Sequence, residues 1–151
     1  MLQRIQTLFL FAVTLLGAAL FFFPFVRYEL PDRLLAVDLM PGAQLHPLAG
    51  IYILPVILNI ITILFSIFVI FRFRNRILQM KLASLLMAMN TILLGVMLLF
   101  DYAETPAGQN LLLKTYAAGA FLPILSIIFS FLAIRFIKKD EELVRSADRL
   151  R

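Results

Sequence analysis

Carboxylate and histidine side chains are the first candidates for chemistry in this sequence. The chain has one histidine, His46, and no cysteine, so it offers neither a thiolate nucleophile nor a multi-histidine site for zinc or haem. Four acidic residues between the apolar stretches could meet at one membrane surface: Asp32, Asp38, Asp101 and Glu104. They follow no metal-ligand spacing, and the sequence has no phosphate-binding loop or hydrolase serine motif. We therefore expect no catalytic residue, metal or cofactor; the weaker alternative is a membrane enzyme that uses these carboxylates.

Polar and small residues within the apolar stretches are the second set of candidates. Each stretch carries one stripe of them at a spacing of three or four residues, which places each stripe on one helix face. In chain order the stripes are Thr7, Thr14 and Gly17; Tyr52, Pro55, Asn59, Thr62 and Ser66; Ser84, Ala88, Thr91 and Gly95; and Tyr116, Gly119, Pro123, Ser126 and Ser130. Asn90 lies beside the third stripe.

Two interpretations of these stripes stay open. In a bilayer, small residues let helices approach closely, and hydroxyl or amide groups bond across the interface, so the stripes predict packing faces. The alternative is a polar pathway for a neutral or lipidic molecule. The candidate residues for either role are Asn59, Thr62, Ser66, Asn90, Thr91, Ser126 and Ser130. The stretches contain no ionisable side chain, which argues against a proton pump or an ion-coupled transporter.

Four apolar stretches must position these residues. They run over 5–26, 51–71, 82–100 and 115–134, and about 20 helical residues suffice to cross a bilayer. Only 15% of the residues are charged, against about 25% in a typical soluble domain. The fold class predicted is an all-α membrane protein, a bundle of four transmembrane helices in two hairpins. We expect one domain over 1–151.

The connecting segments carry their own signals. Apolar and polar residues alternate on both sides of Pro31-Asp32-Arg33, which predicts a short β-hairpin in the first loop. A tight basic turn over 72–81 joins the two helical hairpins, and residues 110–114 could begin the fourth helix early. We expect the tyrosines to lie at the membrane interface as anchors: Tyr28, Tyr52, Tyr102 and Tyr116.

The distribution of basic residues predicts orientation. Eleven of the 14 Lys and Arg residues lie at the termini and in the 72–81 segment, so the positive-inside rule places these in the cytoplasm. The first and third loops then face outward. The location expected is the bacterial inner membrane, crossed several times. The basic pI of about 10 reflects this orientation and contact with lipid headgroups, and we expect no nucleic-acid partner.

The C-terminal tail reads as a cytoplasmic extension of the fourth helix. Residues 135–151 contain no Gly or Pro, and Leu143, Ala147 and Leu150 fall on one narrow edge. This edge predicts a surface that docks a partner, and the alternative is a basic end that rests on lipid headgroups.

The opening segment 1–7, the turn 72–81 and this tail resemble a small inner-membrane family of Bacteroidota, a domain of unknown function (number 4293). The resemblance spans the whole chain and implies four-helix membrane proteins without an assigned activity, so it carries over no catalytic residue. We expect a non-enzymatic accessory or scaffold subunit of a membrane complex. Its partners would be the lipid bilayer and other membrane proteins or further copies of itself. The alternative is a small channel or transporter for a neutral or lipidic molecule.

Overall fold

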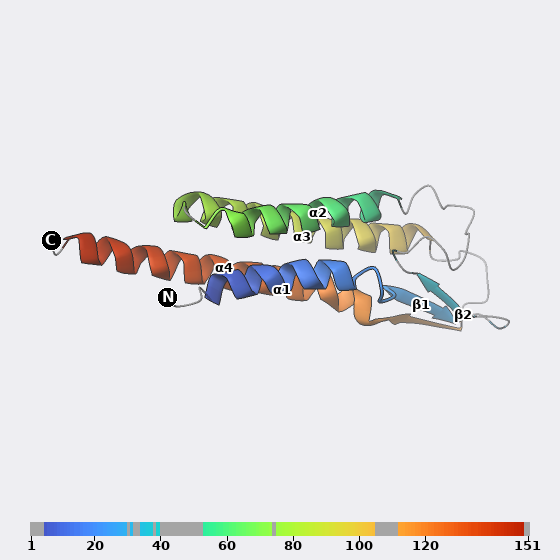
Figure 1. Cartoon of the computed structure of the whole chain (residues 1–151). Coiled ribbons are helices and arrows are strands. Elements are labelled where there is room, and N and C mark those ends of the chain that lie inside the picture. Colours follow the sequence, from blue (N-terminus) through green and yellow to red (C-terminus); the bar gives the residue numbers. More distant parts are fainter. Residues whose placement is uncertain are drawn as a thin grey trace.

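The computed structural model describes residues 5–29, 31, 34–37, 39, 53–73, 75–104 and 112–149. Within these residues the elements in chain order are α1 (Ile5–Ala19), β1 (Val26–Glu29), β2 (Leu34–Val37), α2 (Ile53–Phe71), α3 (Arg76–Glu104), β3 (Leu113–Tyr116) and α4 (Ala118–Arg149). The helices run side by side, with the strands at one end and the extended α4 at the other (Figure 1). We call these the sheet end and the tail end.

Each helix packs mainly against two others: α1 and α3 both lie against α2 and α4. The buried side chains form one apolar cluster toward the sheet end, around Leu20, Leu93 and Met97, and another toward the tail end, around Leu10 and Leu86. Large apolar side chains also cover the outside, such as Leu64, which is 61% exposed. A soluble protein rarely exposes so continuous an apolar surface, so this outer surface suits a membrane.

The first helix is shorter than predicted. The expectation of a helix over 5–26 is wrong beyond Ala19, because the chain turns there and enters β1 at Val26. Pro24 has no backbone N–H for a helix, and the N–H of Phe25 already bonds Val37 O at 2.7 Å. At 15 residues α1 is about 22 Å long, less than the roughly 30 Å of a bilayer core.

Three helices in the described part of the chain, not the four predicted, are therefore long and apolar enough to cross a membrane. They are α2, α3 and α4, over Ile53–Phe71, Arg76–Tyr102 and Ala118–Val144.

The basic turn is also shorter than predicted, because α3 begins at Arg76 and runs to Glu104 instead of covering 82–100. Asn75 caps this start: its side-chain Oδ1 accepts the N–H of Leu78 at 3.1 Å, and its carbonyl accepts the N–H of Gln79 at 2.9 Å. Such a cap satisfies N–H groups that have no partner within the first helical turn. The half of the predicted turn from Arg76 to Lys81 thus belongs to the helix.

The predicted hairpin is confirmed, and a third strand joins it. β1 pairs with β2 in antiparallel register from Val26↔Val37 to Glu29↔Leu34. On its other edge β1 pairs with β3, from Val26↔Tyr116 to Glu29↔Leu113. The prediction that helix 4 begins at 115 or earlier is wrong, because Leu113–Tyr116 is extended in this sheet of order β2-β1-β3. A lone two-stranded hairpin is marginal in stability, and the third strand and the helices beside it supply what it lacks.

The predicted continuation of helix 4 into the tail is confirmed. α4 is one helix of 32 residues, about 48 Å long, and Pro123 lies inside it without ending it. At the tail end it extends well past the other helices (Figure 1).

Candidate functional site

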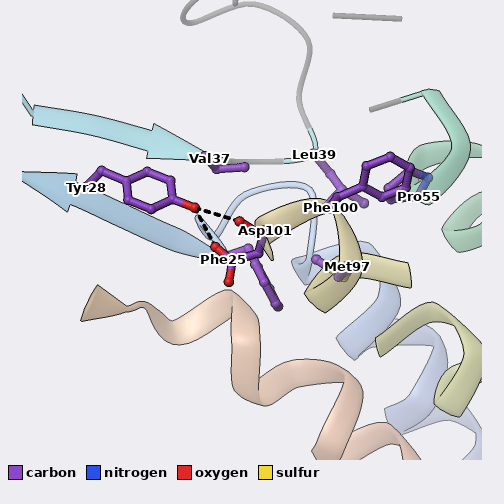
Figure 2. Close-up of a pocket in the computed structure, with 8 residues that line it drawn as sticks. All are labelled: Phe25, Tyr28, Val37, Leu39, Pro55, Met97, Phe100 and Asp101. Atoms are coloured by element: carbon purple, nitrogen blue, oxygen red, sulfur yellow. Dashed lines mark hydrogen bonds between the residues drawn. The ribbon is translucent and has the colours of Figure 1, made fainter. Parts of the chain in front are cut away.

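Asp101, in the last turn of α3, is the polar centre of the sheet end. Asp101 is buried, with 7% of its surface exposed. Tyr28 of β1 donates its hydroxyl to Asp101 Oδ1 at 2.5 Å and lies 3.3 Å from the Asp101 backbone carbonyl (Figure 2). The strand thus reaches the end of a helix 73 residues further along the chain.

Strand β3 supplies two further partners. Lys114 Nζ lies 2.6 Å from Asp101 Oδ2, and the Tyr116 hydroxyl donates to the same oxygen at 3.1 Å. The register of the strands explains why these side chains meet. Tyr28 lies opposite Lys114, and Val26 lies opposite Tyr116, so the side chains of these four strand residues share one face of the sheet. We call Tyr28, Asp101, Lys114 and Tyr116 the Asp101 cluster.

The electrostatics of the cluster suit a fixed ion pair. Burial lowers the pKa of Lys114, but the hydrogen bond and charge of Asp101 outweigh it, and the pKa rises above the ordinary 10.5. The ammonium also lies 5.7 Å from the Tyr28 ring centre and 5.4 Å from that of Tyr116, within cation–π range. A catalytic lysine base needs a lowered pKa, so the raised pKa and the ion pair favour Lys114 as a counter-ion to Asp101. The cluster ties β1 and β3 to α3.

A small pocket lies beside the cluster, between the sheet and the helices. Figure 2 shows its lining, which is apolar apart from the Tyr28–Asp101 pair; the residues are Phe25, Tyr28, Val37, Leu39, Pro55, Met97, Phe100 and Asp101. Its cavity volume is about 20 Å³, enough for about one water molecule. Pockets that hold drug-sized ligands measure roughly 300–1,000 Å³, so this one has no room for such a ligand.

The stripes of the first two helices meet in the structure. Thr14 and Ser66 share a hydrogen bond of 2.9 Å between their hydroxyls, and Ser66 also donates to Leu10 O at 3.1 Å. Nearer the sheet end, Asn59 Nδ2 donates to Gly17 O at 3.0 Å. A Cβ on Gly17 would lie 2.8 Å from Ile63 Cγ1, so α1 and α2 approach closely there because residue 17 has no side chain.

The remaining candidate residues divide by burial. Thr62, Asn90, Ser126 and Ser130 are buried. Three of these side chains donate to the carbonyl one turn earlier in their own helix: Thr62 to Leu58, Asn90 to Leu86 and Ser130 to Ser126. Thr91 is exposed and donates to Met87 O in the same manner.

On α3 the interior face is not the stripe of small residues. Ser84, Ala88 and Thr91 lie on the exposed side, and the buried residues follow a different row: Gln79, Ala83, Leu86, Asn90, Leu93, Met97 and Asp101. The spacing of that row was visible in the sequence, but its polar ends, Gln79 and Asp101, read as loop residues once the helix was placed over 82–100.

One of the four predicted tyrosine anchors is buried inside the protein. Tyr28 is 3% exposed and so cannot face lipid headgroups, whereas Tyr102 and Tyr116 are 83% and 47% exposed. Asp32, Asp38, His46 and Tyr52 lie outside the described residues, as does the side chain of Glu104. Among the residues that are described, no three acidic or histidine side chains gather to hold a metal ion.

The tail end presents the predicted docking edge in part. Leu143 and Val144 are 60% and 42% exposed and belong to the last two turns of α4. This end of α4 extends past the other helices (Figure 1). The side chain of Ala147 and all of Leu150 lie outside the described residues. Nearer the helices, Arg76 Nη1 donates to Asp140 O at 2.9 Å, which ties the start of α3 to α4.

Fold and site together define a mostly helical protein with a small capping sheet and with helices suited to a membrane. A family model described as "Domain of unknown function (DUF4293)" matches residues 2–150, and the chain belongs to this family. The resemblance drawn from the termini and the basic turn is thereby confirmed at the level of the family. Comparison with curated proteins and with solved structures gives no match.

Proposed function

We propose that this chain is a non-enzymatic accessory or scaffold subunit of a complex in the bacterial inner membrane. The observation that carries the proposal is the end of α4, which leaves the helix packing and exposes Leu143 and Val144. We call residues 141–149 the α4 arm. Because the arm continues a membrane-suited helix without a break, a partner bound to the arm would be held in a fixed position relative to the subunit.

The membrane setting is supported by the outer surface of the helices. Leu64 and Phe71 of α2 are 61% and 71% exposed, and Leu99 of α3 is 69% exposed. Lipid tails are the environment that suits such side chains, and the excess of basic residues at the termini and the 72–81 segment favours the tail end as the cytoplasmic one. The sheet and the Asp101 cluster then lie at the outer surface.

The buried polar groups support a scaffold more than a channel. Asn59 and Ser66 bond across to α1, and Thr62 and Ser130 bond carbonyls in their own helices. The bonds from Asn59 and Ser66 to α1 hold helices together in lipid, where each interhelical bond averages about 0.6 kcal/mol, and the bonds of Thr62 and Ser130 leave those hydroxyls already paired. A pathway for a neutral or lipidic molecule would require these helices to part.

The charge of the α4 arm favours a protein partner over the membrane surface. Asp140, Glu141 and Glu142 lie just before Leu143, and anionic headgroups would repel this acidic segment. The ion pair between Lys138 and Glu142, with 4.0 Å between Nζ and Oε1, is also typical of a solvent-exposed helix.

The test is co-purification from membranes with matched variants of the arm. Leu143→Asp places a charge on the exposed apolar edge, and Ser146→Asp adds the same charge at an exposed polar position. We expect Leu143→Asp to lose a stoichiometric partner that the Ser146→Asp protein retains, with both proteins correctly folded and inserted. If Leu143→Asp retains every partner, the arm is not a docking surface.

Truncation gives a second test, and the structure changes where to cut. Ending the chain after Lys139, the cut that the sequence favours, would also remove Asp140, whose carbonyl accepts the bond from Arg76. Ending it after Glu142 keeps both that bond and the Lys138–Glu142 pair. We expect the protein truncated after Glu142 to remain stable and to lose the partner. Its degradation in the membrane would instead make the arm part of the fold.

A further inference from the structure

Charged residues at the tail end change sign along the axis of α4. Every charged residue in the segments 72–81 and 135–139 is basic, whereas the next three residues of α4, 140–142, are all acidic. Arg76 Nη1 donates to Asp140 O at 2.9 Å, so the start of α3 lies level with this change of sign. Each copy of the chain therefore carries a basic region and an acidic segment at the same level.

The basic region has an exposed corner where α2 ends and α3 begins. We call residues 71–77 the α2–α3 corner. Arg72 is exposed there, and its Cζ lies 5.0 Å from the centre of the Phe68 ring. A guanidinium over a ring still presents its N–H groups at its edge, where a carboxylate binds. Three large apolar side chains are also exposed on this corner: Phe71, Phe73 and Ile77.

The α4 arm offers the complementary combination of an acidic and an apolar side chain. Leu143 is 60% exposed, and the side chain of Glu142 just before it is 67% exposed. Glu142 pairs with Lys138 at 4.0 Å, and exposed ion pairs of this kind contribute little stability. A better placed cation can therefore take the place of Lys138.

Glu142 and Leu143 face away from the helices of their own chain. Ile137 is fully buried and marks the packed side of α4. Five and six residues later, Glu142 and Leu143 lie about 140° and 240° around the helix from it. Arg76 of the same chain contacts α4 from the side of α3, at Asp140. The outward side of the arm is thus left for a molecule that approaches from outside.

We propose that the outward side of the α4 arm binds the α2–α3 corner of a second copy of this chain, with Glu142 facing Arg72 and Leu143 facing the apolar side chains of the corner. This inference rests on the proposed function, in which the arm docks a partner, and it names that partner. Copies inserted in the same orientation hold arm and corner at the same level, so they meet side by side. Because the contact joins two different surfaces, it builds a ring if the rotation between copies closes.

Co-isolation of two differently tagged copies from membranes tests the contact by exchange of charges. We expect the tagged wild-type copies to co-isolate. Two copies of Glu142→Arg, or two copies of Arg72→Glu, should co-isolate about tenfold less or worse, because like charges then meet. Glu142→Arg expressed together with Arg72→Glu should restore co-isolation, because each arm then faces a corner of opposite charge. Restoration also shows that both variants fold.

The matched control is Arg135→Glu, which reverses an exposed basic residue of α4 outside the corner and should leave co-isolation unchanged. The inference is overturned if the tagged copies do not co-isolate while another protein co-purifies and is lost in Leu143→Asp; the proposed function then stands. It is also overturned if the charge reversals leave co-isolation unchanged, or if the mixed pair is not restored. If the wild-type protein retains no partner of any kind, the proposed function fails as well.

Discussion

Asp101 shows how one buried carboxylate can hold two kinds of secondary structure together. It receives the hydroxyls of Tyr28 and Tyr116 and the ammonium of Lys114, so each strand that flanks it contributes a donor. Charged groups make the stronger hydrogen bonds in proteins, and breaking such a group leaves the others unpaired. The cluster has the composition of an acid–base site, but its groups bond one another. We therefore assign it a structural role, in which it holds the sheet to α3.

Tyr28→Phe should destabilise the protein by about 1.5–3 kcal/mol, because it removes a hydrogen bond to a buried charge and keeps the ring. The matched control is Tyr102→Phe, whose ring is 83% exposed and whose substitution should change stability by less than about 0.5 kcal/mol. The measurement is unfolding by denaturant in detergent. Equal effects for the two substitutions would show that the Tyr28 hydroxyl does not hold the sheet to α3.

Lys114 should make stability depend on alkaline pH. Its pKa is raised above 10.5 in the folded protein, so the ammonium contributes stability that is fully present below 10.5 and is lost as pH rises through the folded pKa. We expect the melting temperature of the wild-type protein to fall more steeply above pH 10.5 than that of Lys114→Met. The other tyrosines and lysines that titrate in this pH range are the same in both proteins, so their titration changes both melting curves equally. Parallel curves would mean that the ion pair adds no stability.

At the scale of elements, the junction between α4 and the segment before β1 depends on the absence of a side chain at Gly119. The N–H of Gly119 donates to Pro24 O at 2.9 Å, and that of Ala117 donates to Phe25 O at 3.0 Å. These bonds satisfy backbone groups at the start of α4 that have no intrahelical partner. They also bring two backbones close together, which explains why helix and sheet can meet there.

Two glycine substitutions should therefore act in opposite directions. A Cβ at residue 119 would lie 2.6 Å from the carbonyl oxygens of Phe23 and Pro24, so Gly119→Ala should destabilise by about 1–3 kcal/mol. A Cβ at residue 95 meets nothing within 4 Å, so Gly95→Ala should stabilise α3 by up to about 1 kcal/mol. Melting temperatures in the same detergent decide. A Gly119→Ala protein as stable as Gly95→Ala would contradict the close approach.

At the scale of the whole molecule, the short α1 shapes the proposed fit to a membrane. α1 is about 8 Å shorter than a typical bilayer core, while the neighbouring α2, with 19 mostly apolar residues, is long enough to span it. The turn after α1 exposes Phe22 (72%) and Phe23 (47%), and these side chains suit the headgroup boundary. A bilayer accommodates such a mismatch by local thinning or by tilting of the helices.

Orientation is testable with single cysteines, because the chain has none of its own. Cysteines at residues 46 and 104 should react with an impermeant maleimide added to intact spheroplasts, and a cysteine at residue 75 should react only after the membrane is opened. The reason is the excess of basic residues at the termini and in the 72–81 segment. Labelling of residue 75 alone in intact spheroplasts would reverse the proposed topology.

Features that depend on a local pattern of residues could be predicted from the sequence. The apolar runs located the cores of α2, α3 and α4, the alternation around Pro31 located the β1–β2 hairpin, and the tail without Gly or Pro predicted that α4 continues past residue 134. The polar stripes of the first two helices also contained the groups that bond each other, Thr14 with Ser66 and Asn59 with Gly17. The length of an apolar run and the periodicity of its residues are properties of one segment, so they can be read without knowing which other segments contact it.

The remaining features depend on contacts between segments that lie far apart in the chain. The sequence did not reveal which side of α3 faces inward, because helices suited to a membrane are apolar on both their packed and their outer faces. In the structure Asn90 is buried, and Ser84 and Thr91 are exposed. β3 becomes a strand by pairing with β1, about 90 residues away, and no local pattern records that partner. The Asp101 cluster exists for the same reason: its four residues come from three segments that the pairing of β1 with β3 brings to one helix end.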